Sequence, residues 1–190
     1  MTAINKQELL NYLLNFLSEN KKNLFYQIIE ERTKHITVAL EDYFQPQYAS
    51  AVLRSCDVFG IQDVHIIENR NKYTINPSVV HGASKWLNLY KYNKNENNTF
   101  DCINQLKADG YTVYATTPHT NDCLIQDLPL THKIALLFGT EEKGLSEIAM
   151  KNANGFVKIP MVGFTESLNI SVSAAISLYE LSKRLKSSEI

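Results

Sequence analysis

The sequence predicts an α/β fold, in which a mostly parallel β-sheet is flanked by helices. The chain has 190 residues, 44% of them hydrophobic, which suffices for one domain with a full core and not for two ordinary ones. Short runs of β-branched and aromatic residues alternate with helical patterns, as in folds whose parallel strands are joined by helices. Because no repeat or long linker interrupts this alternation, we expect residues 1–190 to form a single domain.

The first elements are predicted to be helical. Apolar residues within 6–31 recur at helical spacing, first from Leu9 to Leu17 and then from Leu24 to Ile29. The polar run ENKKN lies between these groups, so the sequence predicts two short amphipathic helices broken near Asn20. Together they form a helical extension, residues 1–33, ahead of the sheet.

The remainder of the chain carries the predicted sheet. Its strands are short apolar runs, typical of buried parallel strands, at 36–40, 63–67, 87–92, 111–116, 133–139 and 156–160. The clearest helical patterns between and after them cover 47–58, 98–109 and 167–187. The polar run 91–100 is predicted to be a surface loop.

Composition narrows the function. The 19 Lys and Arg residues are balanced by 20 Asp and Glu, so RNA contacts must come from local patches rather than from an overall basic field. The three cysteines lack the paired short spacing of a zinc site, which indicates a reducing compartment and no metal. The N-terminus does not resemble a secretion signal and no segment is long enough to span a bilayer, so we expect a cytoplasmic protein without a membrane partner.

The first candidate functional segment is FQPQYASAVLRSCDVFG, residues 44–60, a proline-containing turn followed by a helix. Arg54 follows Ser50 by four residues and Ala51 by three, so it shares a helix face with small residues that permit close approach of a ligand. The alternative is a surface arginine that pairs with Asp57.

The second segment is LLFGTEEKGLSE, residues 136–147, in which a buried strand ends at Gly139 and Gly144 precedes a predicted helix. Parallel sheets bind ligands at the carboxyl ends of their strands, and glycine lets backbone approach a ligand. The spacing matches neither a dinucleotide fingerprint nor a P-loop, so a plain strand-turn-helix connection is the alternative.

The third segment is KIPMVGFTESLNISVSAAISLYE, residues 158–180. A strand ends at Pro160, and after a short loop an amphipathic helix is predicted to start within 164–169, near Ser167 and Asn169. Ser167 as a simple N-cap is one interpretation, and a polar helix start that borders a ligand is another; the two are compatible.

In this order, the three segments resemble the three signature motifs of the SpoU family of RNA ribose 2'-O-methyltransferases, in the SPOUT superfamily. The resemblance runs from about Ile36 to the C-terminus. It is strongest to the TrmH type, which methylates a D-loop guanosine of tRNA, because HGASKWL (81–87) and the N-terminal extension are shared. The resemblance implies a deep trefoil knot over about 130–190, one of the rare exceptions to unknotted topology.

The knot of this family binds the methyl donor S-adenosylmethionine. By resemblance, the donor-binding residues here are Leu137, Phe138, Gly139, Thr140, Glu141, Ile159, Met161, Gly163, Ser167 and Leu168. The family also implies a homodimer, in which the catalytic arginine of one subunit faces the donor bound by the other.

The resemblance assigns catalysis to Arg54, Ser167, Asn169 and the position of Tyr48. Methyl transfer mainly requires an aligned oxygen nucleophile and exclusion of water. Because a guanidinium is hard to deprotonate, we expect Arg54 to position the ribose and to stabilise developing alkoxide character. The family normally has asparagine where this chain has Tyr48, so a non-catalytic RNA-binding relative is an alternative to an active enzyme.

By this resemblance the expected substrate is a D-loop guanosine of tRNA, and another tRNA or rRNA site is the alternative, because one fold serves many targets. Local basic groups are the expected RNA contacts, and each could instead belong to a solvated helix face. They are Lys21, Lys22, Arg32, Lys34, Lys183, Arg184 and Lys186.

Overall fold

The structure, a computed structural model, describes residues 5–43, 45–119 and 123–188. The chain divides into two compact units, Met1–Arg32 and Thr33–Ile190.

The first unit contains helices α1 (Lys6–Leu14) and α2 (Glu19–Glu30), neither of which has a buried residue. The two predicted helices are confirmed, but the predicted break near Asn20 is wrong. The helices are separated at 15–18, and Asn20 lies in the first turn of α2. Ser18 has the extended conformation of an N-cap and Glu19 places a carboxylate in the first turn, so ENKKN starts a helix instead of interrupting one.

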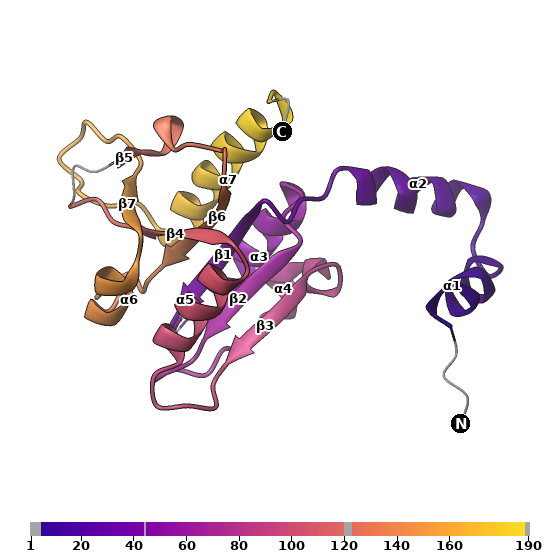
Figure 1. Cartoon of the computed structure of the whole chain (residues 1–190), viewed down its shortest axis with the longest axis horizontal. Helices are drawn as coiled ribbons and strands as arrows, with labels where there is room; N and C mark the ends of the chain where they lie inside the picture. The colour runs from indigo at the N-terminus through magenta and orange to yellow at the C-terminus, as the bar shows by residue number, and fades with distance from the viewer. Residues whose placement is uncertain (1–4, 44, 120–122, 189–190) are drawn as a thin grey trace. The chain divides into compact units, whose positions relative to one another are not determined.

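The second unit is built on a seven-stranded sheet in the order β3-β2-β1-β6-β4-β7-β5 (Figure 1). Every neighbouring pair of these strands is parallel. The strands are β1 (Ile36–Glu41), β2 (Asp63–Ile67), β3 (Asn88–Tyr92), β4 (Tyr111–Thr116), β5 (Cys123–Leu124), β6 (Lys133–Phe138) and β7 (Gly155–Lys158).

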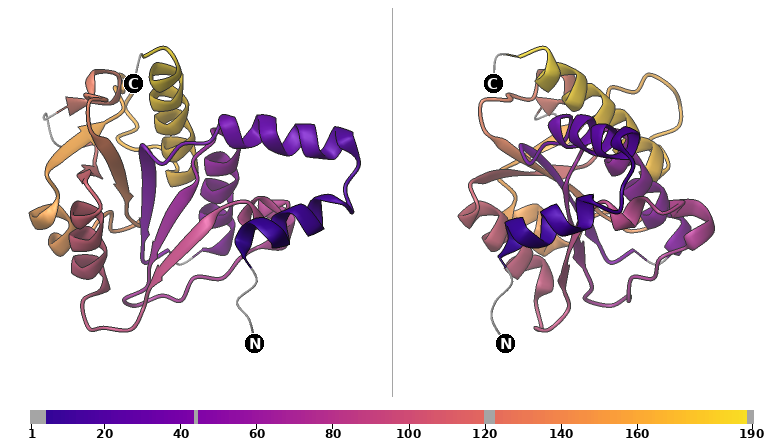
Figure 2. Two further views of the ribbon diagram at one scale, coloured as in Figure 1. Left: turned by 45° about the vertical axis from the view of Figure 1, so that its right-hand side comes forward. Right: turned by 90° about the vertical axis from the view of Figure 1, so that its right-hand side faces the viewer.

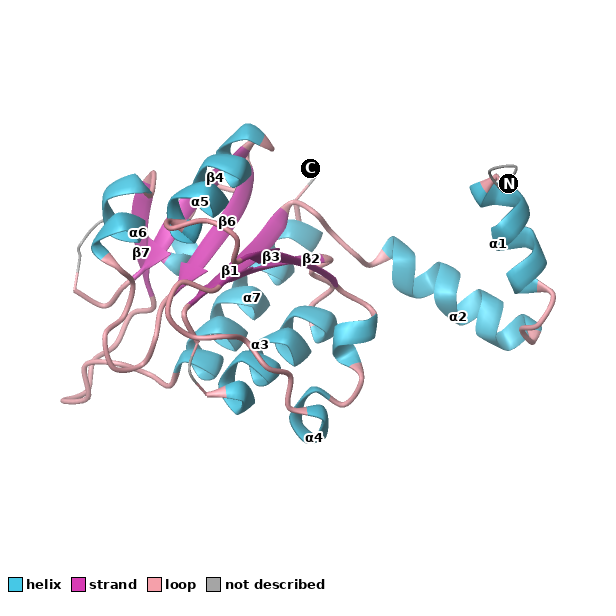
Figure 3. Ribbon diagram, turned by 90° about the horizontal axis from the view of Figure 1, so that it is seen from below, coloured by secondary structure: helices cyan, strands magenta, loops and turns pink. Residues whose placement is uncertain are grey.

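Helices cover both faces of the sheet. Figure 3 shows α3, α4 and α7 on one side and α5 and α6 on the other, and α3 packs along α7. The helices are α3 (Pro46–Val58), α4 (Pro77–Val80), α5 (Asn98–Ala108), α6 (Glu147–Asn152) and α7 (Ile170–Lys186), with 3-10 turns η1 (Ala83–Lys85) and η2 (Ile125–Asp127).

The core has two parts because side chains alternate between the faces of each strand. Leu136 and Phe138 of β6 belong to the cluster packed by α3 and α7. Leu137, between them, belongs to the cluster packed by α5 and α6. This alternation decides which residues of a strand can face a site on either side.

The sheet was largely predictable, with small differences. All six predicted strands are present, but β6 ends at Phe138 and β7 ends at Lys158. The predicted loop at 91–100 is shorter, because β3 continues to Tyr92 and α5 begins at Asn98. The two-residue strand β5 is too short to produce a periodic pattern, and the sequence did not predict it.

The predicted start of the last helix is also wrong. The connection 159–169 is not helical, and α7 begins at Ile170 after the N-cap Asn169. The right-hand view of Figure 2 shows this connection projecting from the body of the fold. Val162 and Phe164 within it are fully exposed, at 105% and 108% relative accessibility, so the apolar residues here do not form the buried face of a helix.

Candidate active site

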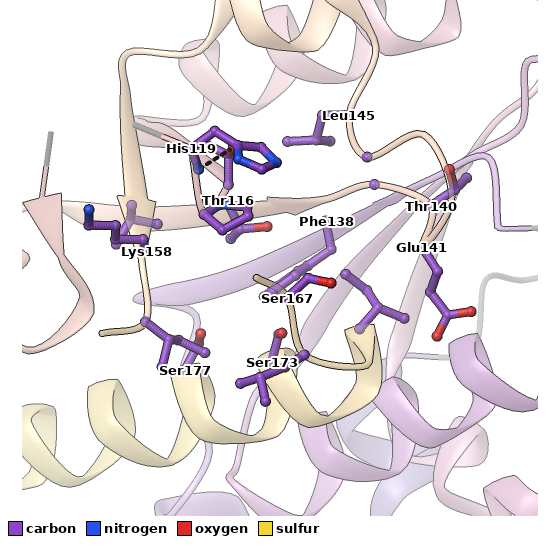
Figure 4. Close-up of a pocket in the computed structure, with 18 of the residues that line it drawn as sticks. Thr116, His119, Phe138, Thr140, Glu141, Leu145, Lys158, Ser167, Ser173 and Ser177 are labelled. Atoms are coloured by element: carbon purple, nitrogen blue, oxygen red, sulfur yellow. Dashed lines mark hydrogen bonds between the residues drawn. The ribbon is translucent and has the colours of Figure 1, made fainter. Parts of the chain in front are cut away.

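A cavity of about 400 Å³ lies where β4, β6 and β7 end at their carboxyl edges (Figure 4). The first turns of α7 close one side of it, and the loop 139–145 closes another. Ligands of parallel α/β sheets bind at this edge of the sheet. The cavity therefore occupies the position that the second and third sequence segments predict.

The loop after β6 requires glycine at two positions. A Cβ atom on Gly139 would lie 2.1 Å from the carbonyl carbon of Gly144, closer than any real packing allows. Gly144 has φ of 66°, in the left-handed region that glycine adopts without strain. The backbones of Thr140 and Gly144 exchange hydrogen bonds of 3.0 and 2.8 Å, which close the loop tightly.

A buried carboxylate fixes the far end of this loop. Glu41, at the end of β1, is 3% exposed. Its oxygens accept hydrogen bonds from the Ser146 backbone N–H (2.8 Å), the Ser146 hydroxyl (2.7 Å) and the Thr99 hydroxyl (2.5 Å). Because Ser146 also caps α6 through its 3.1 Å bond to the Ala149 N–H, Glu41 ties β1, α5 and α6 to the end of the loop.

The start of α7 is fixed by one side chain. Asn169 Oδ1 accepts a 3.0 Å hydrogen bond from the Ser171 N–H, the usual role of an N-cap. Asn169 Nδ2 donates to the carboxylate of Glu141. The second and third sequence segments therefore meet in a direct side-chain contact, and Figure 4 shows Glu141 beside the start of α7.

The donor-binding residues predicted from the sequence fall into two groups. Neither Leu137 nor Gly163 lines the cavity, because Leu137 faces the opposite side of the sheet and Gly163 lies in the exposed connection. Those that line it are Phe138, Gly139, Thr140, Glu141, Ile159, Met161, Ser167 and Leu168.

The sequence did not predict two parts of the lining. The loop after β4, from Thr116 to His119, closes the cavity beside β7, and Ser173 and Ser177 face it from α7 (Figure 4). The rule that ligands bind at carboxyl ends of strands could have identified Thr116, which ends a predicted strand. The two serines follow Asn169 at positions i+4 and i+8, on one helix face.

Arg54 lies apart from this lining. It is exposed on α3 and forms no hydrogen bond or ion pair with any residue for which the structure gives a position, so the alternative pairing with Asp57 does not occur. Tyr48, on the same helix, is half-buried against the core. Neither residue reaches the cavity of its own chain.

The basic residues predicted to contact RNA differ in their engagement. Arg184 donates to the carbonyl oxygens of Ile125 (3.2 Å) and Leu128 (2.7 Å). Lys22 pairs with Glu19 at 2.6 Å, and Lys34 lies 3.6 Å from Asp63. Lys183 lies over the ring of Tyr179. Lys21 and Lys186 are exposed, and Arg32 is half-buried.

Among residues 5–43, 45–119 and 123–188, no three His, Cys, Asp or Glu side chains are grouped as metal ligands. In the same ranges no helix combines the length and apolar character that crossing a membrane requires.

The family model for the SpoU rRNA Methylase family matches residues 35–179, which include the sheet, the cavity and most of α7. The chain belongs to the SpoU rRNA Methylase family. SpoU relatives of known activity match nearly the whole chain. A tRNA (guanosine(18)-2'-O)-methyltransferase of Borreliella burgdorferi is 43% identical over 178 residues, which are 94% of this chain and 80% of the relative. The Thermus thermophilus protein of the same name is 33% identical, over 89% of this chain and 86% of the relative.

Solved SpoU structures share the fold. A TrmH/SpoU tRNA modifying enzyme of A. aeolicus matches with a TM-score of 0.79 and 25% identity, over 89% of this chain and 84% of that one. The SpoU methyltransferase AviRb of Streptomyces viridochromogenes, crystallised with AdoMet, matches with a TM-score of 0.71 and 24% identity, over 86% of this chain and 62% of that one.

Proposed function

We propose that this chain transfers the methyl group of S-adenosylmethionine to the ribose 2'-hydroxyl of guanosine 18 in tRNA. One observation carries the proposal: the cavity is built by the two segments that resemble the donor-binding motifs, in a chain 43% identical to a tRNA (guanosine(18)-2'-O)-methyltransferase. The activity and the donor are those of a SpoU methyltransferase.

The residues that line the cavity fit this donor. A volume of about 400 Å³ lies within the roughly 300–1,000 Å³ typical of small-molecule sites. Leu145, Ile159 and Leu168 offer apolar surface for an adenine ring, while Ser167 and the carboxylate of Glu141 offer polar partners. When bound, S-adenosylmethionine supplies a methyl group that a sulfonium has made electrophilic.

Arg54 is proposed to act on the ribose side. Its guanidinium is exposed and has no partner in the described parts of the chain, so its planar donors are available to a phosphate and a ribose oxygen. It orients the hydroxyl and stabilises negative charge that develops on the oxygen, without giving up its own proton. Asn169, held by Glu141, and Ser167 border the reacting hydroxyl at the start of α7.

Tyr48 is proposed to replace the asparagine of the family motif. It lies on α3 six residues before Arg54, and its ring packs against the core. Its hydroxyl has no hydrogen-bond partner in the part of the chain that the structure describes, so it can contact the ribose. Tyr48→Phe should therefore slow methyl transfer, and Tyr48→Asn should preserve it.

The active form is proposed to be a homodimer. Arg54 does not reach the cavity of its own chain, which supports a site completed by a second subunit. Val172, Ile176 and Tyr179 of α7 are 44%, 38% and 53% exposed, more apolar surface than a solvated helix needs. Light scattering should find a dimer at micromolar concentration. Ile176→Lys should weaken it, whereas Ile75→Lys, at a 42% exposed site outside α3 and α7, should not.

Three finer features belong to this proposal. The likeness in fold to TrmH/SpoU structures supports a trefoil knot over about 130–190, which a crystal structure traced continuously through this region would test. Residues 1–190 are proposed to act as one methyltransferase domain, with 1–33 as its extension. Three free cysteines support a reducing, cytoplasmic location, which fractionation of cells would test.

RNA is proposed to contact local basic groups. Lys183 and Lys186 of α7 are candidates, with Lys21, Lys22, Arg32 and Lys34. Arg184 contributes less, because its guanidinium is held by carbonyl oxygens of its own chain. Binding should weaken with salt, and Lys183→Glu with Lys186→Glu should weaken it further.

The decisive experiment combines three readouts. Purified protein is incubated with labelled S-adenosylmethionine and unmodified tRNA, the methylated nucleotide is mapped, and donor binding is measured by calorimetry. Arg54→Ala should abolish transfer and leave donor binding intact, Arg54→Lys should not restore transfer, and Arg70→Ala, at another exposed arginine, should behave like wild type. Label in ribosomal RNA would reassign the substrate, and RNA binding without transfer to any RNA would indicate a non-catalytic relative.

A further inference from the structure

A second hollow, of about 430 Å³, lies at the opposite end of the sheet from the candidate active site. Asp63, Tyr111 and Lys133, which contribute to its lining, are the first residues of β2, β4 and β6, and Lys34 precedes β1. The active-site cavity instead lies at the carboxyl ends of strands. A six-residue strand such as β1 is about 20 Å long, which is the depth of the sheet between its two ends.

The hollow lies on the face of the sheet that α5 covers, at a part of that face where the strands carry polar and aromatic side chains instead of aliphatic ones. Helix α5 packs on β2, β3 and β4, and on β2 its core partner is Ile67, the last residue of the strand. Two residues before Ile67, on the same face, β2 carries His65, and the neighbouring strand carries Tyr90 directly opposite. A strand face buried only for packing would continue with aliphatic residues.

Three aromatic rings are stacked in this hollow. The His65 ring lies 5.0 Å from that of Tyr90, with 19° between their planes, and 5.8 Å from that of Tyr92, with 28° between planes. His65 Nδ1 lies 3.1 Å from the Tyr92 hydroxyl. His65 is 4% exposed, whereas Tyr90 is 43% exposed, so the stack is buried on its inner side and open at Tyr90.

The hollow contains equal numbers of positive and negative side chains, but some of them have close partners and others are exposed. Lys34 and Lys133 oppose Asp63 and Asp109. Asp63 is held by Lys34 at 3.6 Å and by the Asn88 side-chain amide at 2.7 Å. Lys133 is exposed and lies 5.4 Å from the ring centre of Tyr111. A free anion gains little from balanced charges, whereas a short single strand of RNA offers flat rings for the open face of Tyr90 and phosphates for the exposed ammonium of Lys133.

We propose that this hollow stacks an unpaired base of the RNA substrate on Tyr90, while Lys133, three strands away in the sheet, contacts a phosphate further along the same RNA strand. The proposal rests on the proposed function, because it adds a second contact to the same RNA. It places this contact in the second hollow, away from the reacting ribose at the carboxyl ends of β4, β6 and β7. Base stacking tolerates any sequence, so this contact increases affinity for RNA without selecting the nucleotide that is methylated.

The test compares Tyr90→Ala with Tyr90→Phe, which keeps the ring. Tyr90→Ala should bind tRNA and a short single-stranded oligoribonucleotide about 5- to 150-fold more weakly by fluorescence anisotropy, as expected when one base loses its stacking partner. Tyr90→Phe should bind like wild type. Phe100→Ala, at a 42% exposed aromatic residue near the other end of α5, is the matched control and should also bind normally.

Two further measurements separate this proposal from the proposed function. Lys133→Gln should reduce the slope of log affinity against log salt by about 0.7 for the oligoribonucleotide, as for one lost phosphate contact. S-adenosylmethionine binding should be unchanged in every variant. Loss of oligoribonucleotide binding in Tyr90→Ala supports the hollow even if wild type methylates no tRNA, an outcome that would defeat the proposed function alone.

The proposal is overturned if Tyr90→Ala, folded as judged by its melting temperature, binds tRNA and the oligoribonucleotide within twofold of wild type. It is also overturned if a nucleoside monophosphate binds wild type in a Tyr90-dependent way while RNA binding does not depend on Tyr90, because the hollow would then be a small-molecule site. Equal losses in Tyr90→Ala and Tyr90→Phe would likewise exclude ring stacking.

Discussion

Replacing Glu41 by glutamine should destabilise the protein and loosen the donor-binding loop. Three donors, from Ser146 and Thr99, converge on the buried carboxylate. A glutamine oxygen can accept from the two hydroxyls, but its amide N–H₂ must then face the Ser146 backbone N–H. One buried donor is left without an acceptor, and the other two bonds lose the help of the negative charge.

The magnitude follows from these contacts. A hydrogen bond to a charged group contributes about 1.5–3 kcal/mol, so Glu41→Gln should lower the free energy of unfolding by about 2–3 kcal/mol. For a chain of this length that corresponds to a melting temperature lower by about 5–10 °C. Glu147→Gln is the control, because that side chain is 90% exposed and its pair with Lys151 contributes little.

Calorimetry should also find weaker S-adenosylmethionine binding in Glu41→Gln, since Ser146 ends the loop that lines the cavity. A double-mutant cycle with Ser146→Ala should give a coupling energy above about 1 kcal/mol, as for residues that share one network. A Glu41→Gln protein that melts within a degree of Glu147→Gln would refute this account of the network.

Two further predictions concern Gly139 and His65. Gly139→Ala should abolish donor binding and lower the melting temperature, because its Cβ would meet Gly144 backbone at 2.1 Å; Gly163→Ala, whose Cβ would have 3.9 Å of space, should do neither. Burial lowers the pKa of His65 to about 4, against the opposing effect of Asp63 and Asp109, so folding favours the neutral ring. The free energy of unfolding should therefore fall by up to about 3 kcal/mol as the pH is lowered from about 6.5 to 4. Chemical denaturation should find a shallower fall in His65→Asn. Identical pH profiles of the two proteins would show that His65 does not carry this dependence.

The centre of the parallel sheet could be predicted because β1, β2 and β6 are buried on both faces and so appear as largely apolar runs. The residue at which α7 begins could not be predicted in this way. Residues 164–169 contain the same residue types as a helix start, and two side chains, Ser167 and Asn169, could each serve as its cap. The choice depends on Glu141, which lies 28 positions earlier and binds Asn169. Local propensity does not include such a contact.

The site was predictable only in part for a similar reason. Motif order located the loop at Gly139 and the segment at Ser167, which meet at the cavity. Alternation along β6 turns Leu137 away from it, a consequence of strand register that a motif does not express. The loop from Thr116 to His119 joins the lining only because β4 lies between β6 and β7 in the sheet, an order that the sequence does not reveal.

The hydrogen bonds from Arg184 to two backbone carbonyl oxygens limit where this protein can be shortened or fused. It binds Ile125, the first residue of η2, and Leu128, which follows η2, whereas Arg184 itself lies within the last turn of α7. A gene truncated before codon 184 would leave both carbonyls without that guanidinium, although every residue that lines the donor cavity would still be encoded. Engineered fusions and truncations should therefore retain Arg184, because a shorter chain that keeps every motif loses these two hydrogen bonds.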